Sequence, residues 1–368
     1  MSSDKKAVLV LKDGTVVYGR GFGAITSRQG ELVFNTSMTG YQEALTDPSY
    51  AGQILLMTYP LIGNYGIDIK DKWDSQYSWF ESSHVQVEGF AVRELNTLPE
   101  HRKATLNVDK FLEENGTPGI NDIDTRFIVR HIRNHGVMPA VLATYENGVD
   151  VKKLLDELTF KYENRNFVEK VTTREPLVFG DKNKKTVVLI DYGVKMNIVR
   201  EVVDRRFRVV VLPSFSTIED IKKYEPTGVV LSNGPGDPAI LKDAHETIRK
   251  LAEGNFPILG ICLGHQLMTH AFGGATYKLK FGHHGGNHPV LNKLTEKVAI
   301  TTQNHGYATD HDKMPKDFDV THVNVNDGTI EGMRHKSKQI FSIQYHPESC
   351  PGPRDSKYIF DEFIKFLR

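Results

Sequence analysis

The strongest constraint on the fold lies in residues 186–261, where apolar and mostly β-branched runs alternate with segments of helical character. The runs are TVVLID, RVVVLP, GVVLS and PILGI. Strands that are apolar on both faces are typical of a parallel sheet covered by helices on its two sides. The second half of the chain is therefore predicted to be a doubly wound α/β domain with a mainly parallel sheet, and ligands are expected beyond the carboxyl ends of its strands.

The first part of the chain has a different pattern. Two β-branched runs flank Asp13 and Gly14, which indicates a hairpin, and a further strand is expected over 54–58. Helical periodicity covers 107–114 and 122–135, where Ile123, Phe127, Ile128 and Ile132 form one apolar stripe. We expect a mixed α/β domain over 1–150, a charged connection over 151–185, and the doubly wound domain over 186–368.

Charge and cysteine usage exclude several classes of function. The 46 Lys and Arg residues balance the 46 Asp and Glu residues, which argues against broad nucleic-acid or membrane-surface binding. The chain has two cysteines, too few for a disulfide framework or a cysteine-based zinc site. No apolar run approaches the length of a membrane span. A cytoplasmic location, where thiols stay reduced, is expected.

One of the cysteines, Cys262, lies between Gly260 and Gly264, after an apolar run and before a helical segment. This is the cysteine form of the Gly-x-Ser-x-Gly nucleophile turn, which exposes the nucleophile at the top of a sheet. The N–H of Leu263 would then bind a developing oxyanion. The alternative is a buried structural thiol.

A cysteine nucleophile needs a base, and the base needs an orienting group. His346-Pro347-Glu348 follows another apolar run and offers both, although the chain has fifteen histidines and most are expected to be structural. In LSNGPGDP, Gly234 or Gly236 could supply a second oxyanion donor, and a tight turn with a helix cap at Asp237 is the alternative.

The segment KFGHHGGNHPV bunches three histidines, His283, His284 and His288. Because no cysteine or carboxylate lies nearby at ligand spacing, we expect a shaping loop and no metal site.

Two motifs, GICLGHQL around Cys262 and HPE at 346–348, resemble those of class I, triad-type glutamine amidotransferases. Longer blocks along nearly the whole chain are similar to the small, glutamine-hydrolysing subunits of carbamoyl-phosphate synthetases: FNTSMTGYQEALTDPSYAGQI, IDTRFIVRHIR, LSNGPGDP, KFGHHGGNHPV and TTQNHGYA. The first of these blocks is the most specific to that family.

The resemblance implies a role for each matching position. Cys262 would attack the side-chain amide of glutamine, His346 would transfer the proton, and Glu348 would orient His346, with no cofactor in this chain. The N–H groups of Leu263 and Gly234 would form the oxyanion hole. Substrate contacts would come from Ser37, Gly234, Gly236, Leu263, Gln266, Asn304, Gly306 and Tyr307, so that both domains contribute.

The resemblance also implies a partner. A large subunit that binds ATP and Mg²⁺ would use the ammonia to make carbamoyl phosphate for arginine or pyrimidine biosynthesis, and the heterodimers are expected to associate further. Three rival functions remain: an amidotransferase for anthranilate or GMP synthesis, which would not need the domain expected over 1–150; a non-catalytic scaffold subunit; and a γ-glutamyl hydrolase acting alone.

Overall fold

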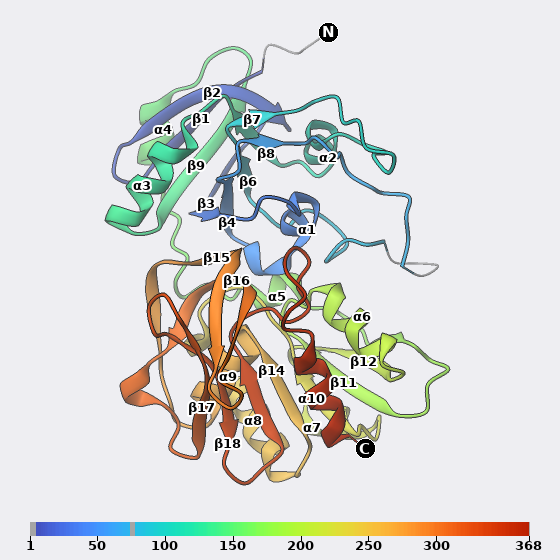
Figure 1. Ribbon diagram of the computed structural model, residues 1–368. Coiled ribbons are helices and arrows are strands. Elements are labelled where there is room, and N and C mark those ends of the chain that lie inside the picture. Colours follow the sequence, from blue (N-terminus) through green and yellow to red (C-terminus); the bar gives the residue numbers. More distant parts are fainter. Residues whose placement is uncertain (1–4, 74–77, 368) are drawn as a thin grey trace. The chain divides into compact units, whose positions relative to one another are not determined.

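The computed structural model describes residues 5–73 and 78–367, and the chain divides into two compact units, residues 1–163 and 164–368 (Figure 1). The division falls inside the predicted connection, 151–185. This segment contains helices α4 (Val151–Asp156) and α5 (Val168–Val171) and strand β10 (Leu177–Phe179). No helix within the described ranges is both long enough and apolar enough to cross a membrane.

The first unit is built around a closed barrel of mixed strand direction in the order β1-β2-β8-β6-β4-β3-β9. The predicted hairpin forms β1 and β2, with Val10 opposite Val16. Parallel pairs join β3 to β4, β4 to β6 and β6 to β8. The strands are β1 (Lys6–Leu11), β2 (Val16–Gly23), β3 (Ser27–Asn35), β4 (Gln53–Met57), β6 (Gly89–Ala91), β8 (Pro118–Asn121) and β9 (Met138–Tyr145), and β5 (Leu61–Ile62) pairs with β7 (Glu94–Leu95) separately.

Short helices accompany the barrel: α1 (Tyr41–Thr46), the 3₁₀ helix η1 (Pro48–Tyr50), α2 (Val108–Glu114) and α3 (Thr125–His135). The predicted stripe of α3 is correct at Ile123, Ile128 and Ile132, which are buried, but wrong at Phe127, which is 50% exposed. Since the helix begins at Thr125, its buried positions are Thr125, Ile128 and Ile132, and Phe127 lies outside this face and contacts the ring of His131.

The second unit contains the predicted parallel sheet. Its central strands run in the order β12-β11-β13-β14-β19, and each neighbouring pair is parallel. They are β11 (Thr186–Asp191), β12 (Arg208–Pro213), β13 (Gly228–Leu231), β14 (Ile258–Ile261) and β19 (Ile340–Ile343). Side chains such as Val188, Val230 and Leu259 are fully buried, as expected for strands covered on both faces.

Antiparallel strands extend this sheet at both edges, so within residues 164–367 the sheet has ten strands. Strand β10 pairs with β12 at one edge, and β18, β16, β15 and β17 continue beyond β19. The longest strands, β15 (Thr276–Asn292) and β16 (Lys297–Thr309), form a ribbon with register shifts near Gly285, while β17 (Phe318–Asn324) and β18 (Ile330–His335) form another pair.

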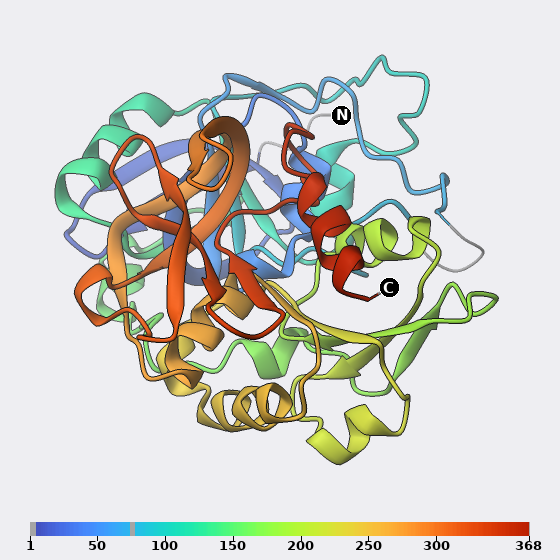
Figure 2. The same cartoon turned by 60° about the horizontal axis from the view of Figure 1, so that its bottom comes forward.

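Helices cover both faces of the parallel strands, as a doubly wound fold requires. Viewed along the sheet, α7, α8 and α9 lie on one side of the strands, and α6 and α10 lie on the other (Figure 2). The helices are α6 (Met196–Asp204), α7 (Ile218–Lys222), α8 (Lys242–Glu253), α9 (Leu263–Ala271) and α10 (Tyr358–Phe366), with 3₁₀ helices η2 (Pro238–Ile240) and η3 (His311–Lys313).

Candidate active site

Cys262 occupies the sharp turn between strand β14 and helix α9, as the sequence predicts. Its backbone has φ 53° and ψ −103°, a conformation that non-glycine residues rarely adopt, and its side chain is buried. The N–H of Cys262 donates to the carbonyl of Ile343 at 2.9 Å, so that β19 fixes the turn. Leu263 is the first residue of α9, and its N–H has no carbonyl partner within the helix.

The two glycines beside Cys262 are required by close backbone approach. A Cβ on Gly264 would lie 2.3 Å from the carbonyl oxygen of Leu231, and a Cβ on Gly260 would lie 2.6 Å from the sulfur of Met268. Real Cβ atoms do not approach other atoms so closely, and the clash at Gly264 is with backbone that cannot move aside easily. The turn therefore depends on glycine at both positions.

His346 and Glu348 follow strand β19, which is the neighbour of β14. Nδ1 of His346 lies 2.7 Å from Oε1 of Glu348, and both side chains are fully buried. The backbone N–H of His346 donates to the carbonyl of Thr302 on β16 at 2.9 Å. The hydrogen bond to Glu348 leaves Nε2 as the nitrogen free to exchange a proton, and the Cys262 sulfur lies close enough to this ring to affect its pKa.

Lys195 is a member of the site that the sequence analysis did not assign. Its Nζ lies 3.0 Å from Oε1 of Glu348 and 2.5 Å from the carbonyl oxygen of Ser349, and the residue is 1% exposed. Asn197 holds the same loop by donating to the carbonyl of Glu348 at 2.5 Å. The sequence did place Lys195 in DYGVK, a loop at the carboxyl end of β11, where site residues are expected. The loop sequence does not indicate that Lys195 contacts Glu348.

The charges of this group reinforce one another. Burial alone would lower the pKa of His346, but the Glu348 carboxylate and the Cys262 sulfur together raise it to about 10. Burial alone would raise the pKa of Glu348, but Lys195 and His346 lower it to about 2. At neutral pH the arrangement therefore favours an imidazolium held by a carboxylate, which is the form the ring takes after it has accepted a proton.

Several of the predicted substrate residues gather around Cys262. The carbonyl oxygen of Asn304 lies 3.6 Å from the Cys262 sulfur. On α9, Gln266 donates from Nε2 to the carbonyl of Tyr307 at 2.9 Å and to Oε1 of Gln344 at 3.1 Å. Strand β16 therefore brings Asn304 and Tyr307 to the same place as Cys262, in the turn before α9, and Gln266, on α9.

The remaining predicted residues are placed as follows. A Cβ on Gly234 would lie 2.0 Å from the carbonyl oxygen of Tyr192 and 2.9 Å from the Leu263 side chain, so this loop passes directly beside the start of α9. Gly236, in the same loop, has φ +96°, and the space beside Gly306 on β16 is open. Ser37 belongs to the first unit, and its contribution to a shared pocket stays a prediction.

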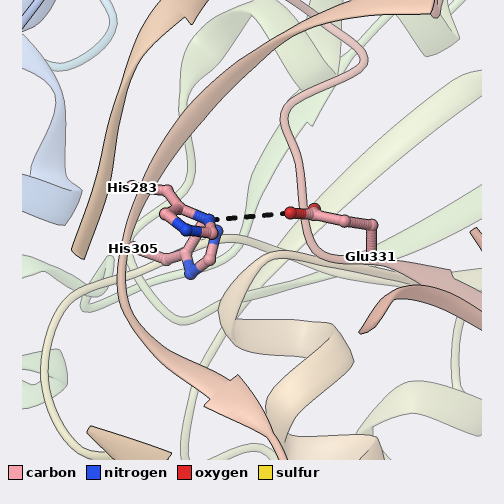
Figure 3. A group of neighbouring side chains, drawn as sticks. All are labelled: His283, His305 and Glu331. Atoms are coloured by element: carbon pink, nitrogen blue, oxygen red, sulfur yellow. Dashed lines mark ion pairs between the residues drawn. The ribbon is translucent and has the colours of Figure 1, made fainter. Parts of the chain in front are cut away.

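A second polar group lies on the antiparallel part of the sheet. His283, His305 and Glu331 place one possible metal ligand atom each within 4.8 Å of one another, and all three are buried (Figure 3). Glu331 is far from His283 along the chain, so the segment KFGHHGGNHPV shows no carboxylate at ligand spacing.

Comparison with known proteins matches both units. Residues 188–366 match the family model of the class-I glutamine amidotransferases, and residues 9–142 match that of the carbamoyl-phosphate synthase small chain, CPSase domain. The carbamoyl phosphate synthase small chain of Methanocaldococcus jannaschii is 49% identical over 366 residues, which cover 98% of each chain. That of Archaeoglobus fulgidus is 48% identical over 365 residues, which cover 99% of each chain.

Similarity at this level over the full length of both relatives is sufficient to assign the family. The match includes residues 9–142, which lie in the domain that an amidotransferase for anthranilate or GMP synthesis would not need. The chain belongs to the family of carbamoyl phosphate synthase small chains and carries a class-I glutamine amidotransferase domain in its second half.

Proposed function

We propose that this chain hydrolyses glutamine to glutamate and ammonia through Cys262, His346 and Glu348. The observation that carries the proposal is the buried group at the ends of β14 and β19. There a cysteine in a strained strand-to-helix turn lies beside an imidazole that a carboxylate holds at 2.7 Å. A structural thiol would need neither the strained backbone nor the charged neighbours.

Before the attack, the Cys262 thiol proton passes to Nε2 of His346, which gives the imidazolium that the site favours, and the thiolate then attacks the amide carbon of the glutamine side chain. The start of α9 favours negative charge on the sulfur. The N–H groups of Leu263 and Gly234 stabilise the oxyanion of the tetrahedral intermediate. His346 then protonates the amide nitrogen, the C–N bond breaks, and ammonia leaves behind a γ-glutamyl thioester on Cys262.

In the second half, a water molecule attacks the thioester while His346 accepts one of its protons. The C–S bond breaks, glutamate leaves, and the proton returns to the sulfur. Glu348 keeps Nδ1 protonated and the ring oriented throughout, and Lys195 compensates the charge of Glu348. The hydrolysis needs no metal or organic cofactor for its chemistry.

Substrate binding is assigned to the residues around the sulfur. Gln266 uses its amide nitrogen on Tyr307 and Gln344, so its Oε1 is the atom available to a donor of the substrate. The open space beside Gly306 gives room for the glutamine backbone groups. Ser37 would complete the pocket from the first unit, together with Gly234, Gly236, Leu263, Asn304 and Tyr307.

The family supports a larger assembly. We infer a large partner subunit that binds ATP and Mg²⁺ and consumes the ammonia to form carbamoyl phosphate, in arginine or pyrimidine biosynthesis. Heterodimers that associate further and a cytoplasmic location are part of the same proposal. Co-purification with an ATP-binding chain roughly two to three times larger would support it.

The test compares Cys262→Ser with Cys350→Ser, which removes the other thiol. In the reconstituted complex, Cys262→Ser should abolish carbamoyl phosphate formation from glutamine but preserve formation from ammonia, whereas Cys350→Ser should preserve both. Loss of both activities in Cys262→Ser would mean that Cys262 is structural. A wild-type chain without glutaminase activity would favour the scaffold, and full activity without a partner would favour a hydrolase acting alone.

A further inference from the structure

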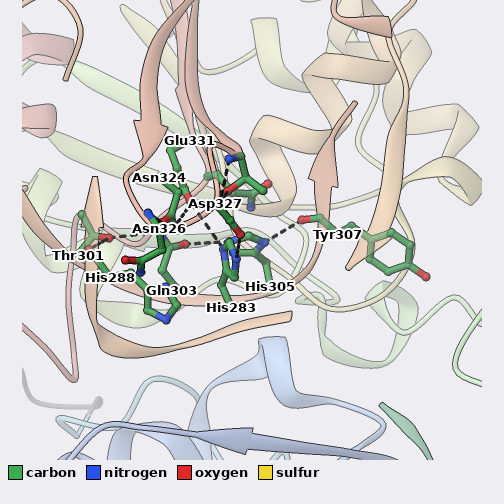
Figure 4. A network of polar contacts seen from close by, with 12 residues as sticks. His283, His288, Thr301, Gln303, His305, Tyr307, Asn324, Asn326, Asp327 and Glu331 are labelled. Carbon is green, nitrogen blue, oxygen red and sulfur yellow. Dashed lines mark hydrogen bonds and ion pairs between the residues drawn. The ribbon is translucent and has the colours of Figure 1, made fainter. Parts of the chain in front are cut away.

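A buried polar cluster joins three strands of the second unit and is not used by the hydrolysis proposed above. His283 comes from β15, His305 from β16 and Glu331 from β18, with Gln303 and Asp327 beside them (Figure 4). His283 is 7% exposed and Glu331 is fully buried. Two imidazoles and a carboxylate in this setting require an explanation of how their charges and protons balance.

The hydrogen bonds of His305 show that a neutral ring has one proton too few for its two acceptors. Nδ1 lies 2.8 Å from the carbonyl oxygen of Tyr307, and Nε2 lies 2.8 Å from Oε1 of Gln303. Both partners are acceptors, but a neutral imidazole has a single N–H. Exchanging the oxygen and nitrogen of the Gln303 amide does not solve this, because its oxygen would then face Oε2 of Glu331, now 3.0 Å from Nε2 of Gln303. In either orientation one contact has no proton.

His283 also has one ring nitrogen, Nδ1, without a hydrogen-bond partner among the described residues. Its Nε2 lies 2.8 Å from Oδ2 of Asp327, while its Nδ1 is buried. Nδ1 lies 3.7 Å from Oε1 of Glu331, which is too long for a hydrogen bond. Two ligand atoms of one tetrahedral zinc ion, each about 2.0–2.1 Å from the metal, lie about 3.3 Å apart, close to the separation found here.

We propose that a divalent transition metal ion, with Zn²⁺ as the best fit to two nitrogen ligands and one oxygen ligand, binds between His283, His305 and Glu331. The ion would take the place of the missing protons. Its charge of +2 would balance the two carboxylates, Glu331 and Asp327, while both imidazoles are neutral. Oε1 of Gln303 lies beside the position of a fourth ligand.

Each of the three proposed ligand side chains has a hydrogen-bond partner that would hold it in position. Metal-bound histidines usually donate their second N–H to a carboxylate or a backbone carbonyl, which fixes the orientation of the ring. Asp327 does this for His283, and the carbonyl of Tyr307 does it for His305. Asn324 donates to Oε1 of Glu331 at 3.0 Å and holds the carboxylate. These contacts come from β16, β17 and the turn before β18.

The ion would have a structural role. Strand β16 pairs with β18 only at Thr309 and Ile330, so few backbone hydrogen bonds join these strands directly. A metal bound by His305 and Glu331 would link them where the pairing is sparse. His305 lies between Asn304 and Gly306, so the link would also hold the part of β16 that lines the Cys262 site.

The proposed metal ligands are too far apart along the chain for the sequence pattern to indicate a metal site. The segment KFGHHGGNHPV contains no carboxylate, which is why no metal was expected there. Asp327 and Glu331 lie far beyond His283 along the chain, and only the pairing of β17 with β18 beside the β15–β16 ribbon brings them together.

The first experiment measures metal content in the full-length chain, purified without a polyhistidine tag from zinc-supplemented medium. We expect about one Zn²⁺ per chain, and almost none in Glu331→Gln or His283→Asn. His311→Gln removes an exposed histidine of the same unit and should retain the metal. Zinc-free chain should give d–d absorption bands on titration with Co²⁺, and a rise in Tm on addition of Zn²⁺.

Asp327→Asn provides a second test, because it leaves the three ligands intact. It should lower the Zn²⁺ affinity by about 10–100-fold in a competition with a chelating dye and preserve the fold by far-ultraviolet circular dichroism. Wild-type chain that contains no metal, shows no Co²⁺ bands and has the same Tm with and without Zn²⁺ would overturn the proposal and would mean that protons alone balance the cluster. Equal metal content in Glu331→Gln and wild type would also overturn it.

Discussion

The ion pair between Lys195 and Glu348 offers a way to separate the structural from the catalytic role of the carboxylate. Glu348→Gln keeps the volume of the side chain but removes its charge, and it leaves Lys195 buried with no anion at 3.0 Å. Removing one partner of a buried ion pair costs about 3–5 kcal/mol of unfolding free energy. The amide also no longer stabilises the imidazolium of His346, and loss of the orienting carboxylate lowers kcat by about 10⁴-fold in triad enzymes.

The double variant Glu348→Gln/Lys195→Met makes the two losses distinguishable. With both charges removed, no unpaired charge stays buried, so most of the lost stability should return and the coupling energy should reach several kcal/mol. Activity should stay at the level of Glu348→Gln, since Lys195 contacts the Glu348 carboxylate and the Ser349 carbonyl and influences His346 through that carboxylate.

Two measurements follow the four chains of this double-mutant cycle. Guanidinium unfolding monitored by circular dichroism gives the stability, and glutamate release from glutamine gives kcat. If the two substitutions lower stability additively, the charges of Lys195 and Glu348 do not compensate one another. If Lys195→Met restores the activity of Glu348→Gln, Lys195 has a role in catalysis of its own.

Three further predictions concern the same site. Gly264→Ala should lower the free energy of unfolding by a few kcal/mol, because its Cβ would lie 2.3 Å from the Leu231 carbonyl oxygen. Gly306→Ala has open space beside it and should fold normally but raise KM for glutamine. Equal Tm values for the two variants would contradict this. His346→Ala should reduce hydrolysis more than Glu348→Ala, because proton transfer is a larger contribution than orientation, and the reverse order of kcat/KM would exchange their roles. Finally, the pKa of His346 rises from 6.5 to about 10, so its contribution to the stability of the fold is complete below pH 6.5 and is lost as pH rises towards 10. The pKa of Glu348 falls from 4.5 to about 2, so its contribution is complete above pH 4.5 and is lost as pH falls towards 2. Unfolding curves across pH should show this dependence in the wild type and not in Glu348→Gln.

Local pattern was sufficient for the parallel core and for the turn that presents Cys262. Continuous β-branched runs specify buried strands, and the glycines at 260 and 264 specify a turn that no other residue fits. His346 and Glu348 were identifiable because they follow an apolar run directly. These features share one property, which is that the residues that determine them are neighbours in the sequence.

Features that depend on distant pairing were not predictable in this way. Lys195 meets Glu348 only because β11 and β19, which are far apart along the chain, end at the same edge of the sheet. Glu331 meets His283 through the register of an antiparallel extension that contains bulges. Phe127 shows that apolar character alone does not place a residue in the core. It lies one position away from the buried face of α3 and is exposed.

The pairing of β14 with β19 has a consequence for how this domain tolerates change. Ile261 pairs with Ile343, and the next residue, Cys262, donates to the Ile343 carbonyl, so nucleophile and base start from adjacent backbones about 4.8 Å apart. Their separation is therefore independent of how many residues connect the two strands. Insertions at the tip between Asn292 and Lys297 could accumulate across species without moving the reacting atoms, whereas a one-residue deletion inside β19 would displace the base and end hydrolysis.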